Sequence, residues 1–128
     1  MTNDDDFNRA IGLILDRLYQ QRPREVFLDV TKLADAEEPN VKLMSSTVDF
    51  LLQEGFLRGH VVDDGHLMYR VTLSLKGLAV LNSVPQSLKG EPPLGQRLRT
   101  ALKSGGREAV NAVISQVIST TLSGKLSL

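Results

Sequence analysis

An apolar stripe near the start of the chain gives the first regular pattern. Its residues recur at spacings of three and four, as on one face of a helix: Phe7, Ile11, Ile14, Leu15 and Leu18. Asp6 is suited to cap the start, and Pro23 pushes the residue before it out of the helical region. The pattern predicts an amphipathic core helix over residues 6–21.

The next segments predict a strand and two helices. Residues 25–30 have the β-branched and aromatic content of a brief strand, and Asp29 or Thr31 is suited to cap a short helix after it. Residues 37–40 contain proline and asparagine, which favour a break. An apolar face then returns along residues 41–55, ending at Gly55: Leu43, Met44, Val48, Phe50, Leu51 and Leu52. Two helices joined by a short turn are typical of a helix-turn-helix.

A β-hairpin is predicted after Phe56, where the apolar period changes to two. Asp64 and Gly65 have the chemistry of a tight turn. Such a turn places Val62 opposite Leu67 and His60 opposite Tyr69. In this register one face packs on the helices (Leu67, Tyr69, Val71 and Leu73), and Met68, Arg70 and Thr72 lie on the other. A slip of one residue would reverse both faces.

The remaining pattern predicts a short helix over residues 73–84, a proline-rich linker over 85–93 and a helical segment over 94–128. Ser104, Gly105 and Gly106 divide that last segment into two amphipathic pieces. The second piece carries a strong apolar stripe that needs a packing partner: Val110, Val113, Ile114, Val117 and Ile118. We therefore expect a domain over residues 1–84, a linker, and a C-terminal segment suited to oligomerisation.

Composition limits the protein class. A chain of 128 residues suffices for one domain and an appendage, and the absence of cysteine excludes disulfides and thiolate zinc sites. The acidic start does not resemble a signal peptide, and no apolar run approaches the roughly 20 residues that cross a bilayer. These features predict a cytoplasmic protein without an integral membrane segment.

Charge is uneven along the chain although its total is zero. Residues 1–38 carry five basic and nine acidic groups, a net charge of −4, whereas residues 85–128 carry six basic and two acidic groups, a net charge of +4. The two ends therefore attract each other. We expect the tail to fold back on the N-terminal region of the same or a second chain, and binding of the basic tail to nucleic acid or anionic lipid is the alternative.

Residues 7–84 resemble the winged helix-turn-helix domains of small bacterial transcription regulators. The segment STVDFLLQEGFL is similar to the end of a recognition helix entering a wing, and YRVTLSLKGLAVL is similar to a second wing strand entering the next helix. The resemblance implies a mainly α fold with a small β-hairpin wing, followed here by C-terminal amphipathic helices that match no known family. It implies a dimeric transcriptional regulator that binds double-stranded DNA.

The resemblance also assigns a DNA interface. The outward positions of the second helix of the motif would be Lys42, Ser45, Ser46 and Asp49, and the wing adds Arg58 and Arg70. Because this face has few cations and includes a carboxylate, a second interpretation stays open. That alternative is an adaptor whose neutral helix face and C-terminal helix bind protein, with a domain that folds without residues 91–128. In the DNA-binding interpretation, the apolar C-terminal helix forms the homodimer.

Other chemistry has weaker support in the sequence. Asp63, Asp64 and His66 cluster at the hairpin, but vicinal aspartates are common turn formers and no spacing matches a zinc site. No nucleophile and base can be paired from the sequence pattern. The sequence predicts no enzyme activity, metal or cofactor.

Overall fold

The fold is mainly helical, with one small antiparallel sheet, as expected. The computed structural model describes residues 3–36, 41–62, 67–84 and 90–122. The elements are α1 (Asn3–Gln21), β1 (Val26–Asp29), α2 (Val30–Ala36), α3 (Val41–Gln53), β2 (Leu57–Val62), β3 (Leu67–Leu73), α4 (Leu75–Asn82), α5 (Leu94–Thr100), the π-helical turn η3 (Ala101–Gly105) and α6 (Gly106–Leu122).

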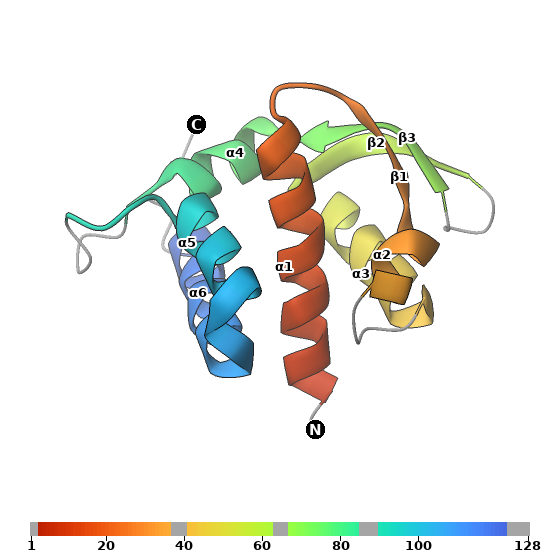
Figure 1. Cartoon of the computed structure of the whole chain (residues 1–128). Coiled ribbons are helices and arrows are strands. Elements are labelled where there is room, and N and C mark those ends of the chain that lie inside the picture. The colour runs from red at the N-terminus through yellow and green to blue at the C-terminus, as the bar shows by residue number, and fades with distance from the viewer. Residues whose placement is uncertain (1–2, 37–40, 63–66, 85–89, 123–128) are drawn as a thin grey trace.

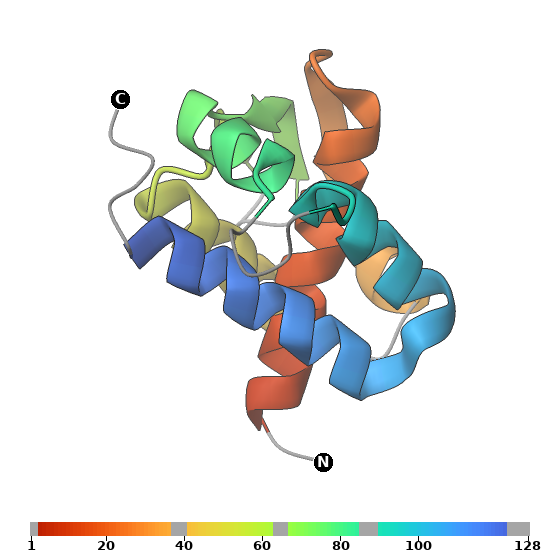
Figure 2. The same cartoon turned by 90° about the vertical axis from the view of Figure 1, so that its left-hand side faces the viewer.

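Helix α1 is the centre of the arrangement. It runs between α2 and α3 on one side and α5 and α6 on the other, and the sheet lies across one end (Figure 1). Figure 2 shows α6 crossing in front of α1. Helix α1 begins at Asn3, so Asp6 lies inside its first turn and is not the cap that the sequence predicted. Its end at Gln21, just before Pro23, agrees with the prediction.

Gly55 ends α3 in the predicted manner. Its φ is 81°, a left-handed conformation that costs glycine little. The amide of Gly55 donates to the carbonyl of Leu52 at 3.1 Å, and the amide of Phe56 donates to that of Leu51 at 2.9 Å. These two bonds form a Schellman motif, which satisfies the last carbonyls of the helix and turns the chain into β2.

The predicted hairpin register is confirmed, but the predicted faces are partly wrong. His60 pairs with Tyr69 and Val62 with Leu67, in a sheet of order β1-β3-β2. Met68 is fully buried and Tyr69 is 47% exposed, the reverse of the expectation. At a β-bulge between these strands, one residue of β2, Gly59, lies opposite two residues of β3. One of those two is Arg70, whose φ is 55°. This bulge restores the predicted inward direction at Val71 and Leu73.

The C-terminal helices belong to the same hydrophobic core as α1. Buried side chains of α5 and α6 join those of α1, α3 and the sheet in one cluster. Four residues of the stripe expected to form an oligomer interface are at most 4% exposed: Val110, Val113, Ile114 and Val117. Only Ile118, at 45%, faces out. Because these four residues are buried inside the chain, they are core residues and not the oligomer interface that the sequence predicted.

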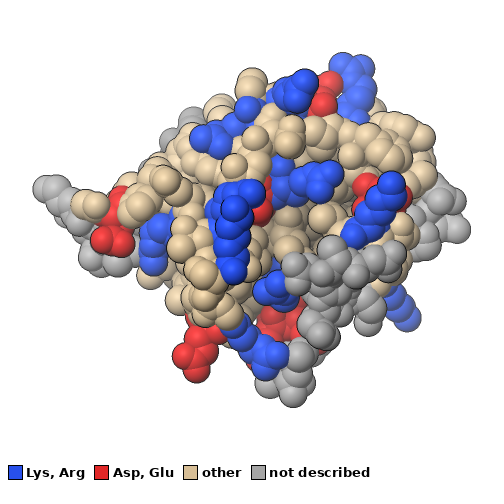
Figure 3. Space-filling model, viewed as in Figure 1, with Lys and Arg blue, Asp and Glu red and all other residues tan. Residues whose placement is uncertain are grey.

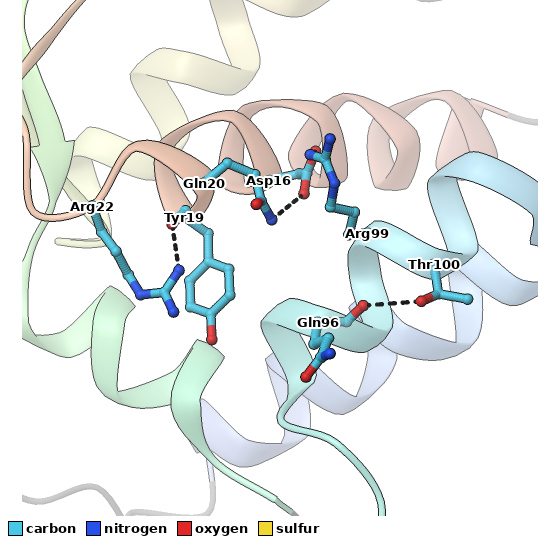
Figure 4. A network of polar contacts seen from close by, with 7 residues as sticks. All are labelled: Asp16, Tyr19, Gln20, Arg22, Gln96, Arg99 and Thr100. Carbon is cyan, nitrogen blue, oxygen red and sulfur yellow. Dashed lines mark hydrogen bonds and ion pairs between the residues drawn. The ribbon is translucent and has the colours of Figure 1, made fainter.

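Polar contacts confirm that the basic tail lies against the acidic N-terminal region. Arg99 of α5 pairs with Asp16 of α1 at 3.1 Å, and Arg107 of α6 pairs with Asp5 at 3.7 Å. Figure 4 shows the first of these contacts in the network between α1 and α5. Asn111 of α6 also donates to Asp5 at 2.8 Å. The opposite charges of the two ends therefore pair with each other within one chain.

Candidate nucleic-acid interface

The outward side of α3 is a polar stripe. Lys42, Ser46, Asp49 and Gln53 are exposed and follow one another at spacings of four, three and four, so they share one face. Met44, Thr47, Val48 and Leu51 are buried on the opposite face. The side-chain amide of Gln53 donates to Asp49 at 2.7 Å. The stripe therefore offers hydroxyl, amide and ammonium groups around one carboxylate.

Ser45 departs from its predicted outward position. Its hydroxyl oxygen is buried and has no hydrogen-bond partner. Position 45 is one residue after the fully buried Met44 and three before the buried Val48, which places it at the edge of the packed face. Because this oxygen is buried, Ser45 does not belong to the exposed polar stripe that was predicted to contact DNA.

The predicted wing residues are exposed on the two hairpin strands. Arg58 lies on β2 and Arg70 on β3, with His60 also exposed. The Arg70 guanidinium pairs with Glu25 at 2.9 Å, and the Arg70 side chain remains 74% exposed. Asp63, Asp64 and His66 lie outside the described residues. Among the described residues, no group of three or more metal-ligating side chains gathers.

Exposed aromatic residues flank the polar groups and were not predicted. The rings of Phe27 of β1 and Tyr69 of β3 are in tilted contact, with centroids 5.1 Å apart and planes at 47°, and the residues are 50% and 47% exposed. Phe50 of α3, predicted to widen the packed face, is 42% exposed and contacts Phe7 of α1 edge to face at 5.3 Å. The bulge in β3 produces the first pair by turning Tyr69 outward. A regular alternation of inward and outward residues along β3 does not predict this pair.

Lys and Arg side chains are spread over the face made by α1, α2 and α5 (Figure 3). On this face a hollow of about 280 Å³ is lined partly by Arg17, Asp29 and Lys32. The Asp29 carboxylate accepts hydrogen bonds from the hydroxyl and the amide of Thr31, which makes it the cap of α2 as predicted. The Thr31 hydroxyl chiefly holds the pKa of Asp29 below its ordinary value of 3.8, aided by the Thr31 amide and by Lys32.

No sequence pattern distinguishes Arg97 from the other arginines of the C-terminal segment. One of its terminal nitrogens, Nη1, is buried without a hydrogen-bond partner beside a second hollow in the C-terminal helices. Arginines at positions 97, 99 and 107 look alike in the sequence, and only their placement separates them. Arg99 and Arg107 face carboxylates of α1, whereas Arg97 does not.

Comparison with models of protein families, with curated proteins and with solved structures finds no match to this chain. No helix in the described part of the chain has the length and apolar character needed to span a membrane.

Proposed function

We propose that this chain is a winged-helix protein that binds double-stranded DNA and regulates transcription. The order of its elements supports the proposal: helix, strand, two helices, and a hairpin whose second strand pairs with the first strand in a β1-β3-β2 sheet. Helix α3 packs against α1 and α2 and leaves its polar stripe exposed. A helix held in this way suits insertion into the major groove.

The exposed groups divide by the contacts they can make. Lys42 and Ser46 can donate to phosphates or base edges, and Arg58 and Arg70 can reach the flanking backbone from the hairpin. Asp49 opposes a polyanion unless it accepts from a cytosine amine. With so few cations, each monomer would bind weakly, and a dimer would double the number of phosphate contacts. Ile118 and Leu122 are the exposed apolar residues of α6 that suit such a dimer.

Fluorescence anisotropy with random-sequence duplex at low salt tests the proposal. We expect micromolar binding that weakens steeply with salt, and a weaker salt dependence in a variant carrying Lys42→Gln and Arg58→Gln. Lys103→Gln is the matched control, because Lys103 is exposed on η3, away from α3 and the hairpin. Asp49→Asn should tighten binding. Absence of binding, or binding indifferent to salt and to the double substitution, would refute DNA recognition.

One observation favours a protein-binding adaptor as the second candidate. Phe50 is exposed on α3 with the polar stripe, and Val61 and Val62 are exposed on β2, which contacts α3. Phe27 is exposed on β1. Such surfaces are typical of protein contacts when they are contiguous. The adaptor proposal expects Asp49→Asn to leave DNA affinity unchanged, and Phe50→Ser to abolish capture of a protein partner while Leu75→Ser, at an exposed apolar residue of α4, does not.

A further inference from the structure

The C-terminal helices form a hollow that the proposed DNA interface does not use. Its volume is about 350 Å³, and it lies between the start of α5, η3 and α6. Pro92, Ala101, Ala109 and Val113 give it mainly apolar walls. This volume is at the lower end of the range for small-molecule sites, roughly 300–1,000 Å³. A compact ligand would fit.

Arg97 gives the hollow a specific polar group. Its Nη1 is buried and has no acceptor, although a buried donor without a partner is unfavourable, and more so when it carries charge. Glu91 also lines the hollow, yet no ion pair joins it to Arg97 among the described residues. The neighbouring Arg99 meets Asp16 at 3.1 Å. Arg97, which is half-buried, is thus a cation at the hollow with no carboxylate paired to it among the described residues.

The wall beside Arg97 has an unusual backbone. Ala101 and Gly105 line the hollow from the π-helical turn η3, and π-helical turns are frequent at functional sites. A Cβ at position 105 would stand 2.4 Å from the Cβ of Ala109, so glycine is what allows η3 and α6 to approach here. This geometry is independent of the charge argument and supports the same location.

We propose that this hollow binds a small organic monocarboxylate with an apolar body. A guanidinium presents a planar fork that matches a carboxylate, and the alanine, valine and proline walls favour hydrocarbon over further polar groups. Glu91 at the same hollow adds negative charge that repels every anion, and this repulsion is smaller for a monocarboxylate than for phosphates and dicarboxylates. The ligand site does not depend on DNA binding and is tested without DNA.

Titration of the full-length, ¹⁵N-labelled chain with hexanoate and benzoate tests this site by NMR. We expect saturable shifts of amide signals in α5, η3 and the first turns of α6. Hexanamide and benzamide have the same bodies without the charge, and they should bind at least roughly tenfold more weakly because they cannot form the charged pair. Absence of saturable shifts with either acid, or equal binding of acids and amides, would overturn the proposal.

Two variants and one control locate the binding. Arg97→Met removes the guanidinium and keeps a flexible apolar chain, so we expect at least a roughly tenfold loss of affinity with an unchanged or higher melting temperature. Ala112→Leu narrows the hollow from an exposed position and should also weaken binding, which keeps the test valid if Arg97→Met does not fold. Arg24→Gln changes an exposed arginine elsewhere and should bind as the parent does. Parent-like affinity in a folded Arg97→Met chain, or in Ala112→Leu, contradicts this site.

Discussion

The ring of Tyr19 lies so close to Gly95 that a Cβ at position 95 would stand 2.4 Å from its Cε2 atom. The guanidinium of Arg22 lies 3.6 Å from the centroid of the same ring. The Tyr19 hydroxyl donates to the side-chain oxygen of Asn82 in α4 at 2.8 Å. One aromatic residue of α1 therefore positions both α4 and α5.

Gly95→Ala should destabilise the fold, although alanine is the better helix former. The added methyl group would overlap the ring of Tyr19, and overpacking of this kind costs about 1–3 kcal/mol. Urea unfolding followed by circular dichroism measures the change. Gln96→Ala, one residue along the same helix and exposed, should stay near the parent value. Equal or greater stability of Gly95→Ala would show that α5 does not pack on Tyr19 in this way.

Ile114→Ala should destabilise the chain far more than Ile118→Ala. Ile114 is fully buried in the shared core, and truncation of such a side chain costs about 2–5 kcal/mol. Ile118 lies one turn away on the same helix and is 45% exposed, so its truncation should cost clearly less. Chemical denaturation of both variants at several protein concentrations measures this difference. A comparable, concentration-dependent loss in both would indicate an intermolecular interface instead.

A chain that ends at Val84 should lack a cooperative unfolding transition. Removal of the C-terminal helices uncovers the face of α1 that they bury, and it deletes seven core side chains: Leu94, Leu98, Ala101, Val110, Val113, Ile114 and Val117. Thermal unfolding monitored by near-ultraviolet circular dichroism checks this. A sharp transition in the shortened chain would support the domain boundary expected from the proline-rich linker.

Thr31→Val should raise the pKa of Asp29 toward its ordinary value, since the Thr31 hydroxyl is the main cause of the lowering. A lowered folded-state pKa means that the ionised carboxylate stabilises the fold at pH values above the unfolded-state pKa, and that this stabilisation disappears as the pH falls through the folded-state pKa. Carbon-detected NMR titration gives the pKa directly. Thr31→Ser keeps the hydroxyl and should leave the pKa low.

Arg70→Gly should stabilise the hairpin while weakening DNA binding. The φ of 55° at Arg70 is unfavourable for a side chain with a Cβ, at a cost of roughly 1 kcal/mol that glycine avoids. The lost pair with Glu25 is exposed and contributes little. Unfolding and anisotropy measurements on one sample separate the two effects. Arg58→Gly, in ordinary strand geometry, should lose both stability and affinity.

The helices were predictable because apolar residues repeat at the helical period, and the register of the hairpin followed from its turn residues. The outward turn of Tyr69 was not predictable, because nothing in the sequence marks Arg70 for a left-handed conformation, and one extra residue there reverses the faces before it relative to those after it. Periodicity thus predicts an element but not an irregularity within it.

The sequence pattern likewise did not identify what α6 packs against. An apolar stripe shows that a helix must be covered, but it does not distinguish a second chain from a distant part of the same chain. The opposite charges of the two ends did favour contact between them, and the pairs of Arg99 with Asp16 and Arg107 with Asp5 confirmed it. The buried Nη1 of Arg97 had no such signal, because burial depends on the assembled fold.

The contact between α1 and α6 also affects the order of folding events during synthesis. Asn8 and Asn111, which share a hydrogen bond of 3.1 Å, are 103 positions apart in the sequence. Helix α1 leaves the ribosome early, but its apolar flank stays uncovered until α6 has emerged. Such exposed surface is prone to aggregation or chaperone capture. We therefore expect a stalled nascent chain lacking α6 to remain sensitive to protease, with protection gained only after release of the last helix.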